Sequence, residues 1–404
     1  MNTPKLNIDH LLLDSILQKY VEASPSAKQL MAAGLVLRDR SGATIYSNAY
    51  GKLNDGDDSP PFTTESPCWV ASLTKLLTAV CVMQLVEKGA VDLDDDVGKI
   101  VPDLADIKIL RGFDNEGNAI LVEKSKPLTL RNLLTHSSGF CYDNFDPEMI
   151  KWSTSVGRTV TSQSHSLEGF TFPLKFEPGE SWMYGVSSDW AARVVEVVSN
   201  STLEAYAQEH VFKPLGMVSS TFFISGHPEL ASRRAIVAFR SPLDGKLVTG
   251  DDPAPLQPKQ ISGGAGLFTT AQDYSNLLAA LVSNDGVLIK PATVKELFRP
   301  QLRDTKDLQA FCDGPFHDAI CPEFPRCLPV NYALGGAVNL EDVPGKRRKG
   351  SVMWSGYTNS HWWIDLETGI AGTLFTQVLP MVDPVVIALY DELERAVYQG
   401  ITST

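Results

Sequence analysis

The sequence predicts a mixed α/β (α+β) protein, with an antiparallel sheet flanked by helices and a mainly helical domain inserted into it. Two observations support this fold class. Strand patterns occur early, at 33–38 and 43–49, and return only late, at 359–365 and 370–377. The long stretch between them has mainly helical periodicity, interrupted by proline and glycine. Strands at both ends of the chain are most simply joined in one sheet.

The individual elements follow from local signals. Residues 8–21 carry apolar side chains at helical spacing, and Asp9 can cap them. A second helix is predicted from 72 to 88 and ends at Gly89, a typical C-terminal stop. The turn 366–369 joins the two late strands into a hairpin. Further helices are expected at 128–134, 187–198, 203–211 and 384–398.

These boundaries predict two domains. Residues 1–96 and 226–404 would form a discontinuous α/β sheet domain, and residues 97–225 the mainly helical domain. The segment 304–330 is rich in proline and cysteine and lacks periodicity. We expect a long loop there, of the kind that often serves as a lid or a mobile insertion.

Composition restricts the partners. The chain has 404 residues, 43% of them hydrophobic, and its net charge of −13 argues against nucleic acid. No apolar stretch is long enough to span a bilayer, and the N-terminus lacks the pattern of an export signal. Six cysteines in a chain of this length do not make a disulfide scaffold, which favours a reducing, cytoplasmic location.

Two clusters could suggest a metal. Cys312, Cys321 and Cys327 share the segment 304–330 with His317, but the usual Cys-x2-Cys pair of zinc sites is missing, so free thiols are the favoured interpretation. The acidic run from Asp92 to Asp96 lacks the glycine and distal glutamate of a calcium loop and is interpreted as a solvated loop. We therefore expect neither a metal nor a cofactor.

The main chemical signal is Ser72-Leu-Thr-Lys75, at the start of the second predicted helix. Residues three apart share a helix face, so the amine can reach the hydroxyl, which needs a partner to become a nucleophile. N–H groups at the helix start can also stabilise an oxyanion. The alternative is a capping serine and a surface lysine. No Gly-x-Ser-x-Gly motif is present, which argues against an α/β-hydrolase triad.

A tyrosine offers a second group. The turn Pro178-Gly179 leads to Tyr184, just before a predicted helix. A phenol close to cations can exchange protons near neutral pH, whereas burial in the core is the alternative.

Glycine-rich turns complete the pattern. The strand at 350–357 ends in Gly356-Tyr357, where the backbone can approach a ligand and supply a second oxyanion donor; a bulge on an edge strand is the alternative. Two turns, "LTHSSG" at 134–139 and "SGGAGL" at 262–267, accompany it. His136 in the first turn is given no chemical role.

The order of these motifs resembles the serine β-lactamase-related superfamily, and within it class C β-lactamases and the related carboxylesterases. The resemblance extends over nearly the whole chain and includes "VFKPLGM" at 211–217 and "GLFTTAQDY" at 266–274. The stretches "ASLTKLLT", "LRNLLTHSSG", "YGVSSDWA" and "RRKGS" resemble, more narrowly, fungal acyltransferases of the lovastatin type. A β-lactamase/transpeptidase-like fold is implied.

The resemblance also implies roles. Ser72 corresponds to the nucleophile, Lys75 to its amine partner and Tyr184 to the general base and acid. The backbone N–H groups of Ser72 and Tyr357 correspond to the oxyanion hole.

The chain departs from β-lactamases at two motifs. Tyr-x-Asn becomes Tyr184-Gly-Val, and Lys-Thr-Gly becomes Trp354-Ser-Gly356, so the amide and the cation that grip a β-lactam or a peptide are missing. An aromatic side chain favours an apolar acyl chain or a polyketide ring instead. The expected substrate-binding residues are Trp354, Gly356, Tyr357 and Trp363; since strand neighbours alternate faces, only one of Trp362 and Trp363 can line the site.

The preferred hypothesis is a serine acyltransferase (transesterase) of secondary metabolism. It would move an acyl group from a thioester, free or on a carrier protein, to an alcohol of a polyketide-like small molecule through acyl-Ser72. A carboxylesterase with the same residues is the alternative, because hydrolysis and transfer share the acyl-enzyme. A non-catalytic binding protein is a third hypothesis, and retention of all three side chains argues against it.

Overall fold

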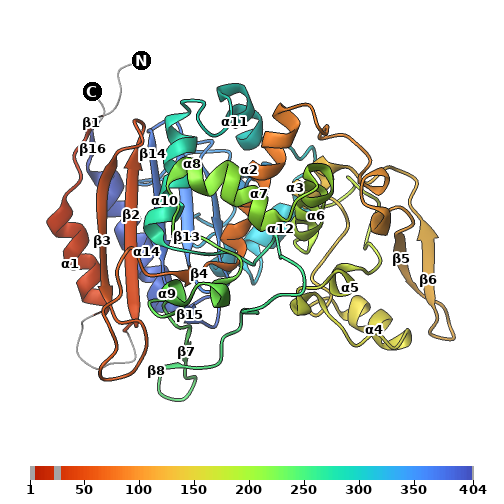
Figure 1. Ribbon diagram of the computed structural model, residues 1–404, viewed down its shortest axis with the longest axis horizontal. Coiled ribbons are helices and arrows are strands. Elements are labelled where there is room, and N and C mark those ends of the chain that lie inside the picture. Colours follow the sequence, from red (N-terminus) through yellow and green to blue (C-terminus); the bar gives the residue numbers. More distant parts are fainter. Residues whose placement is uncertain (1–4, 22–28, 403–404) are drawn as a thin grey trace.

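The protein is built around a seven-stranded antiparallel sheet (Figure 1). The computed structural model describes residues 5–21 and 29–402. β14 pairs with β2, with Gly372 opposite Leu37, so early and late parts of the chain share one sheet as predicted. In spatial order the strands are β10 (Val330–Tyr332), β11 (Ala337–Asn339), β12 (Val352–Ser355), β13 (His361–Asp365), β14 (Ile370–Phe375), β2 (Ala32–Asp39) and β3 (Thr44–Gly51).

Helices cover both faces of this sheet. On one face pack α1 (His10–Val21) and α14 (Pro384–Gln399), where Tyr390 stacks on His361 with ring centroids 4.4 Å apart. On the other face lies α10 (Ala271–Ser283), whose Tyr274 donates a hydrogen bond to the carbonyl of Leu73, just before α2 (Thr74–Glu87). Every residue of α2 from 74 to 85 is buried, as expected of a helix with apolar side chains all round. The start of α2 is therefore fixed at the centre of the molecule.

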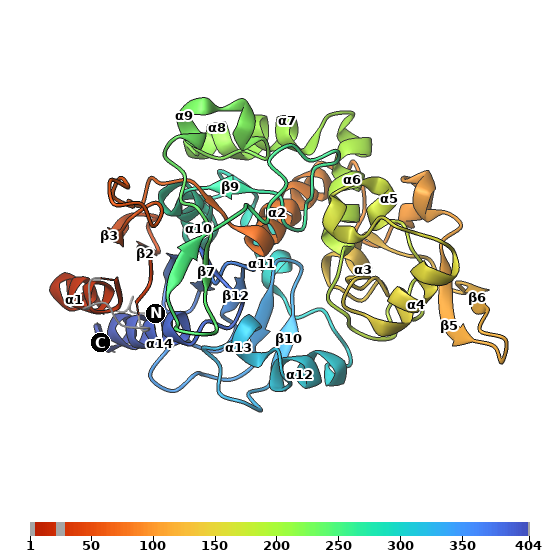
Figure 2. The same cartoon turned by 90° about the horizontal axis from the view of Figure 1, so that it is seen from below.

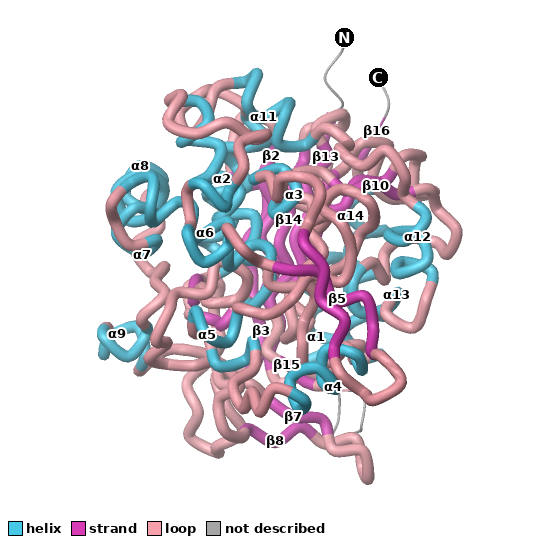
Figure 3. The backbone as a smooth tube through the Cα atoms, turned by 90° about the vertical axis from the view of Figure 1, so that its right-hand side faces the viewer, coloured by secondary structure: helices cyan, strands magenta, loops and turns pink. Residues whose placement is uncertain are grey.

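The helical part of the chain packs beside α2. Residues 108–199 lie toward the right in Figure 1, whereas residues 203–215 lie nearer the centre, where they contact α2 and α10. It also contains a β-hairpin, β5 (Lys108–Phe113) and β6 (Ala119–Glu123), where mainly helical structure was predicted (Figure 3). Gly112 and Gly117 have positive φ, which no helix interior accepts. The two-domain division itself stays a prediction. The helices here are α3 (Leu130–Leu134), α4 (Pro147–Ser155), α5 (Leu167–Phe170), α6 (Ser187–Ser199), α7 (Leu203–Ala207) and α8 (Lys213–Leu215).

The segment 304–330 is not the long loop that we expected. It contains α12 (Lys306–Asp313) and α13 (His317–Ile320), which lie close to β10 (Figure 2). Leu308 and Cys312 are buried at helical spacing, and Phe311 packs against the core beside them. The helical period is therefore present in residues 306–313, and the expectation of a segment without periodicity was wrong for this stretch.

The cysteines are all free thiols, and five of the six are buried. His317 in α13 has its Nδ1 2.8 Å from the carbonyl oxygen of Cys312, so its ring binds backbone. Within residues 5–21 and 29–402, no cluster of three or more histidine, cysteine or acidic side chains is arranged to hold a metal ion. None of the helices among these described residues has the length and apolar character needed to cross a membrane.

Shorter elements complete the fold. α9 (Pro228–Ala231) and α11 (Pro291–Phe298) are peripheral helices. In the small sheets, β4 (Cys68–Trp69) pairs with β9 (Phe268–Thr269), and β1 (Lys5–Leu6) pairs with β16 (Ile401–Thr402). A third small sheet has the order β15 (Val378–Leu379), β7 (Ala238–Arg240), β8 (Leu247–Thr249), with β7 in the middle.

Candidate active site

Ser72 lies in a single 3₁₀ turn, Ala71–Leu73, that leads directly into α2. The residue before it, Ala71, has a φ of 44°, in the left-handed region that costs a non-glycine residue roughly 1–3 kcal/mol. The hydroxyl of Thr74 holds this bend by donating to the Ala71 carbonyl at 2.6 Å. The bend leaves Ser72 half-buried between buried neighbours.

Lys75 is 5% exposed and directs its Nζ at three oxygen atoms. These are Ser72 Oγ at 3.1 Å, Tyr142 Oη at 3.2 Å and the Gly264 carbonyl oxygen at 2.8 Å. An ammonium has three N–H bonds, so each one finds an acceptor here. The structure thus brings Ser72 and Lys75 together and rules out a solvated surface lysine.

Tyr184 completes the group. Its Oη lies 2.7 Å from Ser72 Oγ, within hydrogen-bond distance. The Nζ of Lys75 lies 4.6 Å from the centre of the Tyr184 ring. Trp354 donates a further hydrogen bond from its Nε1 to Tyr184 Oη, at 2.9 Å. The Tyr184 hydroxyl thus has two partners, the Ser72 hydroxyl and the indole N–H of Trp354, and the Lys75 amine lies over the tyrosine ring.

The backbone fixes Tyr184 on both sides. Gly179, with a φ of 84°, donates its N–H to the Ser137 carbonyl, and Met183 donates to the His136 carbonyl at 2.9 Å. After the tyrosine, a Cβ on Gly185 would lie 2.3 Å from the carbonyl carbon of Cys141. Only glycine allows the two segments to approach so closely.

His136 supports this arrangement without entering it. Its side chain is 1% exposed, and burial, together with the charge of Lys75, lowers its pKa well below the ordinary value. The neutral ring packs against that of Tyr184, with centroids 4.8 Å apart. This contact agrees with a packing role.

Two contributions to the site were missed in the sequence. Tyr142 bonds Lys75, and burial raises its pKa well above the ordinary value. Gly264 supplies a carbonyl to Lys75, and Asp189 holds that turn by accepting from the Gly264 N–H at 3.1 Å and from the hydroxyl of Ser262. The "SGGAGL" motif was a usable signal for the turn. Nothing marked Tyr142, because its role depends on contacts between distant segments.

The segment predicted to supply the second oxyanion donor also lies against the chain next to Ser72. A Cβ on Gly356 would lie 2.6 Å from the carbonyl oxygen of Val70, so the end of β12 touches the chain just before Ser72. The rings of Tyr357 and Trp69 have centroids 6.3 Å apart. Gly356 therefore allows the end of β12 to pass close to the backbone of Val70. Tyr357, the next residue, is 40% exposed and lies at the surface.

The tryptophans differ from expectation. Trp354 was expected to form an open substrate wall, but it is buried and bonds Tyr184. Trp363, also expected in the site, lies on the opposite face of the sheet, with its ring centroid 5.8 Å from that of Tyr390 in α14. Register explains this: Trp362, not Trp363, pairs with Trp354, so only Trp362 shares its face. The choice of Trp363 was wrong, although the expected alternation of faces is present.

Comparisons with known proteins agree with this geometry. A family model described as beta-lactamase matches residues 17–395. Among curated proteins, a monacolin J acid methylbutanoyltransferase from Aspergillus terreus is 34% identical over 399 residues, covering 96% of this chain and 95% of the relative. A lovastatin esterase from Penicillium rubens is 33% identical over 373 residues, covering 90% and 92%.

A solved structure gives the same picture. Unliganded simvastatin synthase from Aspergillus terreus matches with a TM-score of 0.89 and 33% identity, covering 96% of this chain and 97% of that chain. The family model and these relatives cover nearly the whole sequence, so they include both the sheet and the helical part. The chain therefore belongs to the β-lactamase family, in the branch that includes fungal acyltransferases.

Proposed function

We propose that the protein is a serine acyltransferase that transfers an acyl group from a thioester or ester to an alcohol through acyl-Ser72. One observation carries the proposal: Ser72 Oγ has Tyr184 Oη at 2.7 Å and Lys75 Nζ at 3.1 Å. A serine hydroxyl between a phenol and an amine can lose its proton as it attacks a carbonyl.

Acylation uses all three side chains. Tyr184, as a phenolate, takes the proton of Ser72 while Oγ forms a bond to the carbonyl carbon of the donor. The N–H groups of Ser72 and Tyr357 stabilise the resulting oxyanion. When the carbon–sulfur bond breaks, the thiolate leaves with the proton that Tyr184 returns. Lys75 keeps the serine and the phenol in place and compensates the negative charge.

Deacylation repeats these steps with an alcohol. Tyr184 removes the proton of the alcohol, whose oxygen attacks the acyl carbon, and then returns that proton to Ser72 Oγ as the new ester leaves. Water in place of the alcohol gives the free acid instead. A transferase therefore has to bind its acceptor well and keep water away.

Aromatic side chains around the site support an apolar acceptor. Four phenylalanine or tyrosine side chains are exposed among the described residues, and three adjoin site residues. Tyr357 follows Gly356; Phe145 donates its N–H to the Tyr142 carbonyl; and Phe316 stacks on Phe311, whose ring is 6.5 Å from that of Tyr184. Exposed aromatic rings gathered at a site favour a flat or apolar ligand.

The relatives favour the same substrate class. We infer a polyketide-like alcohol as acceptor by analogy with the monacolin J acid methylbutanoyltransferase. A donor carried on a carrier protein, and a cytoplasmic location, are parts of this proposal. The lovastatin esterase relative makes ester hydrolysis the second candidate function.

The test follows both products. We would incubate the protein with a butanoyl thioester and a panel of alcohols, and measure acid and ester together with acyl-Ser72 by mass spectrometry. We expect an adduct on Ser72, its loss in Ser72→Ala, and turnover slowed by a factor of about 10²–10⁴ in Tyr184→Phe.

Two results decide against the proposal. Rapid acid formation that no alcohol changes would favour the esterase. Absence of any Ser72 adduct, with several activated esters, would contradict an acyl-enzyme altogether.

A further inference from the structure

Gln377 follows β14, the strand that joins the late part of the sheet to β2. It is 5% exposed and belongs to neither segment of the proposed oxyanion hole. Its Nε2 lies 3.0 Å from the Trp69 carbonyl oxygen and 3.1 Å from Thr358 Oγ1. Trp69 lies three residues before Ser72, and Thr358 directly follows Tyr357. Gln377 thus links the two segments that supply the oxyanion donors.

Thr358 closes the connection. Its hydroxyl donates to the same Trp69 carbonyl at 3.2 Å, so three groups form one small network. From the other side, the hydroxyl of Thr376 donates to the Thr358 carbonyl at 3.0 Å. Thr358 and Thr376 are fully buried. Hydrogen bonds in such surroundings are electrostatically stronger than in water and costly to break.

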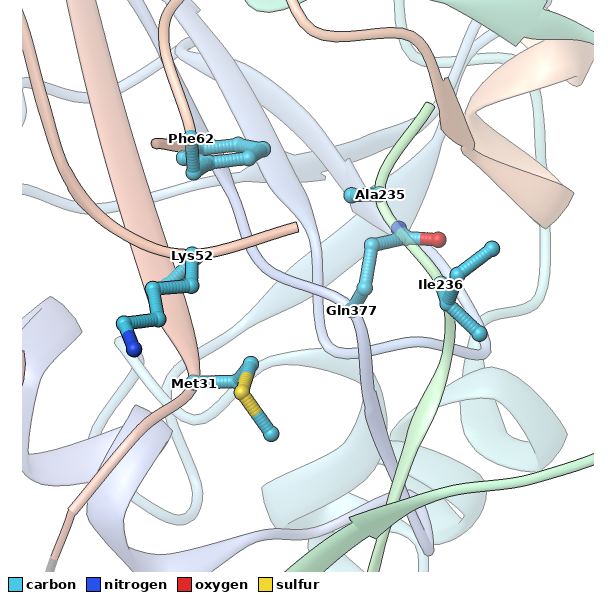
Figure 4. Close-up of a pocket in the computed structure, with 7 residues that line it drawn as sticks. Met31, Lys52, Phe62, Ala235, Ile236 and Gln377 are labelled. Carbon is cyan, nitrogen blue, oxygen red and sulfur yellow. The ribbon is translucent and has the colours of Figure 1, made fainter. Parts of the chain in front are cut away.

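The orientation of the Gln377 amide follows from its neighbours. Nε2 faces the Trp69 carbonyl and also the Thr376 carbonyl at 2.7 Å, and carbonyl oxygens only accept. The amino group must therefore point to them. Figure 4 shows the amide oxygen directed toward Ala235 and Ile236 in a small recess, and it has no hydrogen-bond partner among the described residues. The two N–H bonds of the amide therefore serve three acceptors: one bonds the Thr376 carbonyl, and the other is left for the Trp69 carbonyl and the Thr358 hydroxyl.

We propose that Gln377, with Thr358, is a positioning residue that holds the Ser72 and Tyr357 amides at the spacing an oxyanion requires. Neither side chain touches the reacting atoms. Their effect is on transition-state stabilisation, because the two donors come from segments that are distant in sequence and must be fixed before the reaction. The inference rests on the proposed function, since it assumes that an oxyanion forms next to Ser72.

The test compares three near-isosteric variants. Gln377→Met removes the donors, and Thr358→Val removes one hydroxyl. Thr373→Val is the matched control, because Thr373 is also fully buried and its hydroxyl also bonds a backbone carbonyl, that of His361, but has no contact with residues 69–72. Two quantities are measured: the dissociation constant of phenylboronic acid, whose tetrahedral adduct on Ser72 imitates the oxyanion, and kcat and KM for a butanoyl thioester.

We expect Gln377→Met and Thr358→Val to weaken boronate binding and lower kcat by about tenfold to hundredfold, less than the loss of an oxyanion donor itself. KM should change less than twofold, and Thr373→Val should match the wild type. Melting temperatures show whether each variant is folded. If Gln377→Met is unstable, the result for Thr358→Val, the smaller change, decides the test. If Gln377→Met and Thr358→Val match Thr373→Val in boronate binding and in kcat, the positioning role is overturned, while the proposed function still stands. Wild-type protein that forms no Ser72 adduct would contradict the proposed function and this inference together.

Discussion

Single residues determine how Tyr184 can work. Its hydroxyl is contacted by Ser72 on one side and by the indole N–H of Trp354 on the other. In the β-lactamase pattern a lysine stands at the Trp354 position. A neutral donor there can still stabilise negative charge on the phenol, but it cannot pair with a carboxylate of the substrate. Trp354, the residue proposed to remove lactam specificity, thus keeps contact with the proposed base.

The first prediction concerns Trp354→Phe, which keeps a buried ring and removes one N–H. A hydrogen bond to a charged group contributes about 1.5–3 kcal/mol, so kcat should fall roughly tenfold to hundredfold with little change in KM. Trp363→Phe is the control, because Trp363 is equally buried but lies on the far face. An equal loss of kcat in both variants would show that packing, not the hydrogen bond, matters.

The second prediction concerns Gly185→Ala. The added Cβ would meet the Cys141 backbone at 2.3 Å, so the Tyr184 segment has to move away from Tyr142. We expect kcat to fall at least about tenfold, since small displacements of a catalytic group are costly. Gly226→Ala is the control, because its Cβ would meet nothing within 4 Å. Steady-state kinetics on both variants, at matched thermal stability, checks the prediction.

Single elements explain what the sequence could and could not predict. Short motifs predicted that Ser72, Lys75 and Tyr184 belong to one site, and the structure places the three side chains in contact. Their proposed chemistry requires particular residue types at fixed spacings, which a motif can record. Tyr142 and Gly264 were missed, because their contacts depend on packing between segments distant in the chain. The helix α12 was missed for another reason: its helical period covers only eight residues of a segment rich in proline and cysteine. The choice between Trp362 and Trp363 depends on the register of β13 in the sheet. Both faces of β13 are buried, so its alternation of apolar and polar residues does not show which tryptophan faces the site.

The third prediction concerns α12 and α13. Phe316 is 53% exposed and stacks on Phe311, with ring centroids 5.3 Å apart, and the Phe311 ring lies 6.5 Å from that of Tyr184. We therefore expect Phe316 to contact an apolar acceptor bound near Tyr184. Phe316→Ala should raise KM for apolar alcohols severalfold and leave the rate of Ser72 acylation unchanged. Phe239→Ala removes an exposed aromatic ring from β7 and should change neither. A slower acylation in Phe316→Ala would indicate damage to the site itself.

At the scale of the whole molecule, a buried ionic cluster joins late segments of the chain. Arg347, fully buried, bonds Glu323 at 3.2 Å and Glu394 of α14 at 2.7 Å, and it also bonds the Tyr390 hydroxyl. Glu323 follows α13, so the cluster ties the region of α12 and α13 to the far face of the sheet. Burial raises the pKa of Glu323 to about 7, although the charge of Arg347 opposes the shift.

The fourth prediction concerns the pH dependence of stability. Unfolded glutamate titrates near pH 4.3, so between about pH 4.3 and 7 the folded protein binds more protons at Glu323 than the unfolded chain. The stability contributed by this group is complete below that range and is lost as the pH rises through about 7. Urea unfolding at several pH values should show the wild type losing up to a few kcal/mol that Glu323→Gln retains. Glu341→Gln, at an exposed position, should follow the wild type.

The pairing of β14 with β2 also has a consequence for the timing of synthesis. Ser72 leaves the ribosome early, whereas Gly356 and Gln377, which hold its surroundings, follow roughly 300 residues later. At about 5–20 residues per second, this delay amounts to some tens of seconds. Until then the proposed nucleophile lacks its proposed second oxyanion donor, and the sheet lacks its central strands. A nascent chain should therefore remain unreactive toward thioesters until its last strands have been added.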